Sequence, residues 1–150
     1  MTHNKIVPNL WLCDNGGDIS AIPDYYKNIF GKQFQPGQVI ALGETPSGRT
    51  EMCEVRIFGQ NYLLMNTAKP HHPLNDAVSL MIYCENQAEI DYYWDGFTRE
   101  GKESQCGWCI DKFGLRWQVL PQNLPELMSK PNAFQVMMGQ KKIVIADYLR

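Results

Sequence analysis

The sequence predicts an α+β protein made of two successive modules, each with the order strand, helix, strand, strand, strand, and a short C-terminal helical extension. In each half, a strand-like run is followed by one stretch with apolar residues at helical spacing and then by further strand-like runs. The same order returns after about seventy residues, and such a repeat outweighs any single propensity. We therefore interpret the chain as a single domain with modules at 6–68 and 77–121 and an extension at 122–150.

The first module opens with a short apolar run, Ile6–Cys13, which predicts a strand that ends in turn-forming residues. From Ile19 to Phe30 the apolar residues recur every three or four positions, which predicts a helix with Pro23 in its first turn and Gly31 as its C-cap. Gly59 separates the last two strand-like runs and predicts a tight hairpin. The strand-like runs after the helix are Val39–Leu42, Met52–Phe58 and Gln60–Asn66.

Residues 67–76 contain two prolines and two adjacent histidines and predict a linker. The second module then repeats the pattern with a strand at Ala77–Cys84 and a helix at Gln87–Glu100, which Gly101 ends. Three further strand-like runs close the module, namely Lys102–Trp108, Cys109–Lys112 and Leu115–Leu120. The extension is expected to hold short helices at Leu124–Ser129 and Asn132–Met138 and an amphipathic segment at Lys141–Leu149.

Composition is that of an ordinary globular protein, with 150 residues of which 44% are hydrophobic and 20% charged. The net charge of -2 arises from interspersed acids and bases, so nucleic acid is not an expected partner. No apolar run approaches the roughly 20 residues that span a bilayer, so no membrane association is expected. The N-terminus lacks the apolar region of a secretory signal, and the five cysteines form no recognisable disulfide framework. A cytoplasmic location with free thiols is the expectation.

The stretch from Cys106 to Pro121 carries the most informative polar groups. Side chains alternate along a strand, so Arg116 and Gln118 share one face while Trp117 lies on the other. A buried amide is costly without a partner, which makes Gln118 a candidate for orienting a ligand. By the same alternation Asn9 and Trp11 share a face of the first strand, and aromatic side chains supply rigid apolar area for a small ligand.

Other residues allow two interpretations. Cys106 and Cys109 form a CxxC, but a hairpin is predicted after it in place of the helix that activates redox thiols, and a second CxxC that would complete a zinc site is missing. Cys106 alone remains a candidate for a pocket-lining or nucleophilic role, with simple packing as the alternative. Trp11 and Trp108 are each either pocket or core residues. His71 and His72 could be metal ligands, but they lie among prolines in a predicted linker, where solvated loop residues are the alternative.

Two predictions concern packing alone. Trp94 and Trp117 are expected to pack a helix against a sheet. Asp111 and Lys112 are expected to be turn residues that form a surface ion pair of little energetic value.

Several of these motifs together resemble a known group of proteins. They are Asn9–Asp14 (NLWLCD), Tyr25-Tyr26 with Ile29-Phe30, Gln105–Trp108 (QCGW), Asp111–Gly114 (DKFG), Trp117–Val119, Leu124–Leu127, Gln135–Met138 and Lys141–Ile143. The chain resembles the vicinal oxygen chelate superfamily of glyoxalases, extradiol dioxygenases and bleomycin-resistance proteins. Within it, the chain is similar to the PhnB-like group, often labelled 3-demethylubiquinone-9 3-methyltransferase. The resemblance covers nearly the whole chain, and QCGW and DKFG are its specific part.

The resemblance implies the glyoxalase/bleomycin-resistance fold, in which two curved sheets face each other around a cavity and the helices lie outside. It also implies a homodimer. In metal-using members the ligands are His or Glu side chains of the first and last strands of each module. By position these ligands fall near Val7, at Ser79 and at Gln118 in this chain, where amide and hydroxyl groups replace the donors that a divalent metal needs. No metal and no cofactor are therefore expected.

Our leading hypothesis is a protein that binds a small, partly aromatic or apolar molecule in this cavity without metal. The alternatives are a metal-dependent lyase or isomerase of the glyoxalase kind, the methyltransferase of the group's label, and an interaction module. Methyl transfer is weakly supported because the chain lacks a glycine-rich strand-to-helix loop. No catalytic residue is assigned. The expected ligand-binding residues are Asn9, Trp11, Asn66, Ser79, Cys106, Trp108, Arg116 and Gln118.

Overall fold

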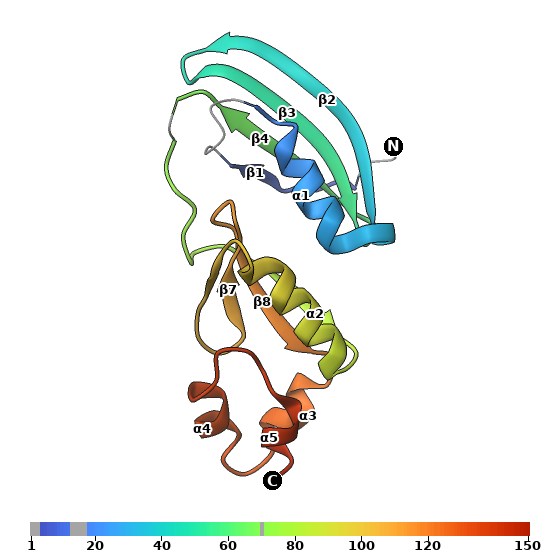
Figure 1. The fold of residues 1–150 in the computed structure, drawn as a ribbon, viewed down its shortest axis with the longest axis vertical. Coiled ribbons are helices and arrows are strands. Elements are labelled where there is room, and N and C mark those ends of the chain that lie inside the picture. Colours follow the sequence, from blue (N-terminus) through green and yellow to red (C-terminus); the bar gives the residue numbers. More distant parts are fainter. Residues whose placement is uncertain (1–3, 13–17, 70) are drawn as a thin grey trace. The chain divides into compact units, whose positions relative to one another are not determined.

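The chain forms two compact units, Met1–Pro73 and Leu74–Arg150 (Figure 1). The computed structural model describes residues 4–12, 18–69 and 71–150. The boundary between the units lies inside the segment 67–76 that the sequence predicts as a linker. Among the described residues, no helix combines the length and the apolar character required to cross a membrane.

The first unit contains one helix and one four-stranded sheet. Its elements are β1 (Asn9–Trp11), α1 (Ala21–Phe30), the 3-10 helix η1 (Gly31–Gln33), β2 (Phe34–Thr45), β3 (Gly48–Ile57) and β4 (Gln60–Thr67). The strand order in the sheet is β1-β4-β3-β2. β1 runs parallel to β4, and the other pairs are antiparallel.

The second unit repeats this design. Its elements are β5 (Ser79–Cys84), α2 (Gln87–Thr98), β6 (Lys102–Glu103), β7 (Trp108–Ile110), β8 (Arg116–Pro121), α3 (Leu124–Met128), α4 (Ala133–Met138) and α5 (Ile145–Tyr148). The strand order is β5-β8-β7-β6, and again the first strand pairs in parallel with the last. The α+β repeat of strand, helix and three strands is therefore confirmed.

Each helix packs its apolar stripe against one face of its own sheet. In α1 the buried side chains are Ile22, Tyr25, Tyr26, Ile29 and Phe30, and in α2 they are Ile90, Tyr93, Trp94 and Phe97. The Phe97 ring stacks on the indole of Trp117 in β8, with centroids 4.3 Å apart and planes at 12°. Trp94 is also buried and donates from Nε1 to Glu103 Oε1 at 3.1 Å. The predicted packing of both tryptophans between helix and sheet is confirmed.

Local signals explain where these elements begin and end. Asn86 caps α2 by accepting from the Glu89 N–H at 2.9 Å, and Glu89 Oε2 accepts in return from the Glu85 N–H at 2.6 Å. The turn between β3 and β4 has positive φ at Phe58 (48°) and Gly59 (79°), the geometry of a two-residue hairpin. Gly101 follows the end of the second helical region. Only glycine fits at this position, because a Cβ would lie 2.0 Å from the Ile110 carbonyl oxygen.

Several strand bounds differ from the sequence-based expectation, and the differences at β1, at β2 and around Cys106 are informative. β1 spans only Asn9–Trp11, and Cys13 lies outside the described residues. β2 is longer than Val39–Leu42 and carries two register shifts. The strand expected over 102–108 is interrupted because Cys106 (φ 59°) and Gly107 (φ 83°) adopt left-handed turn geometry.

The C-terminal extension belongs to the second unit and has its own apolar cluster. Its buried members are Leu120, Leu127, Ala133, Ile143 and Tyr148. Gln87 at the start of α2 holds the extension through its side chain, which donates to the Ile143 carbonyl and accepts from the Ile145 N–H, both at 2.9 Å. The extension is therefore an integral part of this unit.

Candidate functional site

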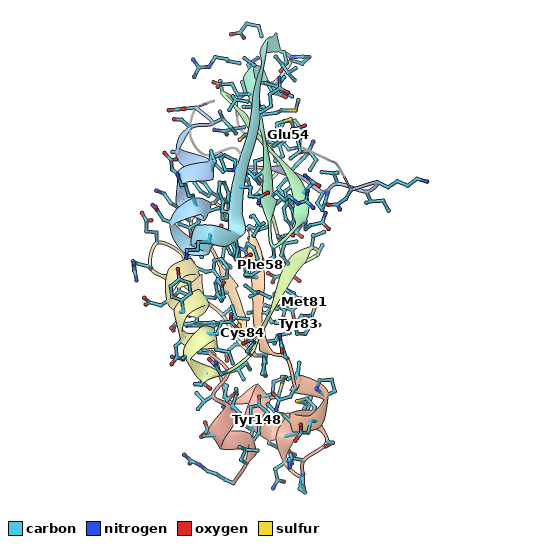
Figure 2. All side chains as sticks on the ribbon, turned by 90° about the vertical axis from the view of Figure 1, so that its right-hand side faces the viewer. Glu54, Phe58, Met81, Tyr83, Cys84 and Tyr148 are labelled. Atoms are coloured by element: carbon cyan, nitrogen blue, oxygen red, sulfur yellow. The ribbon has the colours of Figure 1, made fainter. Side chains whose placement is uncertain are left out.

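The first sheet has one face toward α1 and one face away from it, which we call the open face of the first sheet. Cross-strand partners point to the same side, so the register assigns the residues of this face. Asn9 pairs with Leu63, which also pairs with Glu54, and Trp11 pairs with Met65, which also pairs with Met52. Figure 2 shows Glu54 projecting from this side of the sheet. The face combines aromatic, apolar and charged groups, and all six side chains keep some contact with solvent.

Trp11 is fixed on this face by two contacts. Its Nε1 donates to Thr67 Oγ1 at 3.1 Å. The imidazole of His71 lies flat on the indole, with ring centroids 3.4 Å apart and planes at 12°. His72 meets His71 edge-on at 5.1 Å. Both histidines are exposed, and the stack shows that the Trp11 indole can hold a planar ring.

Asn66 lies on the opposite side of the first sheet from Asn9 and Trp11. It pairs with Glu51 and so alternates with Met65, the partner of Trp11. Its side chain is completely buried and donates from Nδ2 to the Asp18 carbonyl at 3.0 Å. This placement gives Asn66 a structural contact and separates it from the other predicted residues.

The second sheet has an equivalent face away from α2, the open face of the second sheet. Its members by register and alternation are Ser79, Met81, Tyr83, Trp108, Arg116 and Gln118. Gln118 is central, because it pairs with both Met81 and Trp108, and its Nε2 donates to Ser79 Oγ at 2.9 Å. Met81 and Tyr83 project from the sheet in Figure 2 and are 47% and 53% exposed. Four predicted residues, Ser79, Trp108, Arg116 and Gln118, therefore share one surface.

Arg116 is engaged by the segment that precedes β5. Its Nη1 donates to the carbonyls of Leu74 at 2.9 Å and Gly114 at 2.7 Å, and its Nε donates to Asp76 Oδ1 at 2.9 Å. These bonds engage Nε and Nη1 of a side chain that the sequence predicts to bind a ligand. In this structure Arg116 fixes the start of β5, which carries Ser79.

Cys106 lies in the turn before β7, next to the C-terminal extension. Its N–H donates to the Gln140 carbonyl and that of Gly107 to the Lys141 carbonyl, both at 2.8 Å. Cys106 and Cys109 are free thiols. Cys109 is fully buried, and burial, followed by the nearby Asp111 and Glu103 carboxylates, raises its pKa to about 12. The raised pKa keeps Cys109 as a neutral thiol, the form that packs in a protein core.

The pKa of Cys109 predicts how stability responds to alkaline pH. An ordinary cysteine thiol has a pKa of 9.0, whereas the pKa of Cys109 in the folded chain is about 12, so above pH 9 the unfolded chain loses a proton that the folded chain keeps. The stabilisation is complete below pH 9 and is lost as the pH rises toward 12, by about 1.4 kcal/mol per pH unit for one group. Urea unfolding of wild type and Cys109→Ala at pH 8 and pH 10.5 should show a smaller alkaline loss in the variant. Equal losses in both proteins would contradict the assignment.

The sequence interpretation missed the role of Asp111, which is expected at the surface but is buried in the structure. Asp111 Oδ1 accepts from the N–H groups of Phe113 and Leu115 at 2.9 and 3.1 Å, and its Oδ2 accepts from Trp117 Nε1 at 2.9 Å. Lys112 Nζ lies 3.4 Å from Glu100 Oε1 and forms an ion pair with it. Asp111 therefore organises the turn that delivers β8, and with it Gln118, to the sheet.

Glu54 and Asn61 are two further residues that the sequence interpretation did not select. Both line a cavity of about 190 Å3 in the first unit. The signal was present in the alternation of β3, where Met52, Glu54 and Arg56 interleave with the buried Cys53, Val55 and Ile57. Because Cys53, Val55 and Ile57 are buried on the side of the helix, alternation places Glu54 on the open face.

A separate cleft of about 630 Å3 lies beside the C-terminal extension. Its lining residues are Glu85, Asn86, Gln87, Gln122, Asn123, Val144, Ile145, Ala146 and Leu149. None of the predicted site residues lines it.

The side chains at the positions where the resemblance leads us to expect metal ligands are not ones that a divalent cation prefers. These positions hold Val7, Ser79 and Gln118, which offer an alkyl group, a hydroxyl and an amide whose nitrogen is turned toward the hydroxyl. Within the described parts of the chain, no three His, Cys, Asp or Glu residues converge as a metal site would require.

Comparisons with solved structures show the fold. A putative 3-demethylubiquinone-9 3-methyltransferase, PhnB protein, from Bacillus cereus is 21% identical, with a TM-score of 0.66 over 79% of this chain and 99% of that one. Protein PA1353 from Pseudomonas aeruginosa is 14% identical, with a TM-score of 0.58 over 77% and 97%. The E126Q mutant of the fosfomycin resistance protein FosX from Listeria monocytogenes, complexed with Mn(II) and 1S,2S-dihydroxypropylphosphonic acid, is 13% identical, with a TM-score of 0.52 over 81% and 96%.

No curated protein matches the chain significantly. In contrast, residues 4–120 match the family described as 3-demethylubiquinone-9 3-methyltransferase. The match ends at the last residue but one of β8, so the C-terminal extension lies beyond it. The predicted glyoxalase/bleomycin-resistance fold is confirmed by the two four-stranded sheets and the structural neighbours. This chain therefore belongs to the 3-demethylubiquinone-9 3-methyltransferase family, whose model covers more than half of its length.

Proposed function

We propose that this protein binds a small, partly aromatic organic molecule on the open face of a sheet, with a candidate surface in each unit, and that it does so without a metal. The observation that carries the proposal is the flat stack of His71 on Trp11 at 3.4 Å. The imidazole occupies the position that a planar ring of a ligand would take. The bond from Trp11 Nε1 to Thr67 holds the indole in place, so little side-chain entropy is lost when a ligand binds.

The open face of the second sheet supports the proposal with a different chemistry. Gln118 donates one amide hydrogen to Ser79 Oγ, and its second amide hydrogen and its carbonyl oxygen are groups that can orient a ligand. Trp108 lies beside it by register and supplies apolar area. An oriented amide among apolar side chains is the usual composition of a small-molecule site.

A fragment screen tests this function directly. Quinoline, coumarin and 2-naphthol present planar rings, and cyclohexanol and decalin serve as apolar controls of similar size without an aromatic face. We expect saturable quenching or shift of tryptophan fluorescence, together with a rise in Tm, for at least one planar fragment and none of the controls. Equal responses to planar and saturated fragments would contradict the proposal that the Trp11 indole binds planar rings.

Gln118→Leu provides a site-specific prediction for the second sheet. The variant keeps the size of the side chain but loses its hydrogen-bonding groups, so the affinity for a bound fragment with polar substituents should fall by about 1–2 kcal/mol, or roughly 5- to 30-fold. Isothermal titration calorimetry measures the change. Gln122→Leu is the matched control, because Gln122 is an exposed amide just past the end of β8. A loss of the same size in both variants would contradict the role of Gln118.

We also propose that the protein assembles as a homodimer. The support is the exposure of Met81 and Tyr83 on the open face of the second sheet, since exposed apolar side chains that gather on one face mark interaction surfaces. Sedimentation velocity should show a dimer that dissociates in Met81→Glu. Tyr92→Glu on the exposed side of α2 is the control, and a wild-type monomer at high concentration would reject the dimer.

A further inference from the structure

The turn that carries Cys106 offers an accessible thiol in the second unit. Of the four cysteines in the described parts of the chain, Cys106 alone is partly exposed. The other three, Cys53, Cys84 and Cys109, are buried, and burial raises the pKa of each. A buried neutral thiol reacts slowly with an oxidant in solution, because oxidation requires thiolate character and access. Cys106 is therefore the thiol in this part of the chain that an oxidant can reach.

This turn lies against the C-terminal extension and borders its apolar cluster. The Cys106 N–H donates to the Gln140 carbonyl at 2.8 Å. A Cβ on the next residue, Gly107, would come within 3.1 Å of two side chains of the cluster that also contains Tyr148. The Gln140 side chain donates from Nε2 to the carboxylate of Asp147 at 3.1 Å. The backbone of Gln140 thus holds the Cys106 turn, while its side chain holds the helix that carries Tyr148.

Tyr148 is the polar member of this cluster and lies within the extension (Figure 2). It is 3% exposed, and within the described residues its hydroxyl has no hydrogen-bond partner. A polar group that is buried without a partner costs about 1–3 kcal/mol. Burial raises the pKa of Tyr148, and the Cys106 thiol raises it further, ahead of the Asp147 carboxylate. The contacts of the turn and this influence agree that the thiol lies near the Tyr148 hydroxyl.

An oxygen atom on Cys106 Sγ would give the Tyr148 hydroxyl a partner. The sulfur of a thiol is a weak acceptor, whereas an oxygen bonded to it accepts as other hydroxyl oxygens do. A hydroperoxide supplies this atom: Sγ attacks one peroxide oxygen, the S–O bond forms as the O–O bond breaks, and the thiol proton passes to the departing oxygen. The sulfur loses two electrons and the peroxide gains them, so the products are a sulfenic acid and an alcohol or water.

We propose that Cys106 is a site of oxidation by hydroperoxides and that Tyr148 stabilises its sulfenic acid. The Tyr148 hydroxyl donates to the oxygen on Cys106 Sγ, so a donor without a partner in the reduced protein gains one in the oxidised protein. The stabilising residue belongs to the C-terminal extension, beyond the residues 4–120 that match the family. The site does not depend on ligand binding at the open faces of the sheets.

Trapping with dimedone, which reacts with sulfenic acids, tests the site of oxidation. The reduced, full-length chain is treated with one equivalent of hydrogen peroxide and then with dimedone, and tryptic peptides are sequenced by mass spectrometry. We expect the adduct at Cys106 and none at Cys84 or Cys109. Cys106→Ser should lose this adduct, whereas Cys53→Ser, which removes a buried thiol, should keep it. A disulfide between Cys106 and Cys109 in place of the adduct would overturn the proposal, as would equal labelling of the buried cysteines.

Tyr148→Phe tests the stabilising role, because it removes only the hydroxyl. The reduced variant should keep at least the wild-type Tm, since the group that it loses has no partner among the described residues. After peroxide is removed with catalase, the species that reacts with dimedone should decay about fivefold faster in the variant, as the loss of one hydrogen bond implies. Tyr92→Phe, which removes a hydroxyl from an exposed side chain of α2, is the matched control and should decay like wild type.

Equal decay in wild type and Tyr148→Phe would overturn the role of Tyr148, because it would mean that Cys106 is only an exposed thiol. A purely structural role of the hydroxyl would change the Tm of the reduced protein and leave the lifetime of the sulfenic acid unchanged. The planar fragments of the previous section report on Trp11, so failure there can be told apart from failure at Cys106.

Discussion

Asp111→Ala is expected to lower the free energy of unfolding by about 3–5 kcal/mol. The carboxylate is buried and accepts from two backbone N–H groups and from the indole of Trp117. Alanine would leave three donors without this acceptor in a region with little access to water, at about 1–3 kcal/mol for each unsatisfied donor. Relaxation of the turn and entry of water into the space would recover part of that sum. Urea denaturation monitored by circular dichroism measures the result.

Asp111→Asn separates the two halves of this network. The amide oxygen can still accept from the N–H groups of Phe113 and Leu115, but the amide nitrogen would face Trp117 Nε1, placing one donor against another. The loss should therefore fall between those of wild type and alanine. Lys112→Ala is the surface control and should change the free energy by less than about 0.5 kcal/mol, because its pair with Glu100 is exposed. A loss below about 1 kcal/mol in Asp111→Ala would contradict the structural role.

The case of Asp111 shows where sequence reasoning reaches its limit. The DKFG motif marks a turn, and the turn is present. Whether the Asp111 carboxylate is exposed depends on where Trp117 and α2 pack. The local sequence gives no information on this tertiary packing. The element order was predictable because helical spacing and strand runs are local signals. The break at 104–107 was missed because Cys106 takes a left-handed conformation that favours glycine.

The site residues show the same division between local and tertiary information. Alternation along one strand correctly placed Asn9 with Trp11, and Arg116 with Gln118. The face on which Asn66 lies could be assigned only from the register of β4 against β1, since a shift of one residue moves a side chain to the other face. The bonds from Arg116 to Leu74 and Asp76 join residues about forty positions apart and could not be inferred from spacing.

Trp11→Ala is expected to weaken the binding of a planar fragment by about 2–3 kcal/mol, or roughly 30- to 150-fold, as for a central tryptophan of a binding surface. Trp11→Phe keeps a flat ring but loses the hydrogen bond to Thr67, so the binding free energy of the fragment should weaken by only about 1 kcal/mol. Calorimetry with the fragment that binds wild type most tightly measures both. Tyr92→Ala, which removes an exposed aromatic ring from α2, should leave the affinity unchanged.

His71→Ala distinguishes a ligand platform from a purely structural stack. If the imidazole occupies the place of a ligand ring, its removal frees the indole face and the fragment should bind a few times more tightly, since it no longer displaces His71. If His71 and Trp11 only stabilise each other, His71→Ala should lower stability and leave fragment affinity unchanged or reduced. A gain in affinity in His71→Ala together with a loss in Trp11→Ala is the combination that a structural stack cannot produce, because such a stack would make both substitutions act in the same direction.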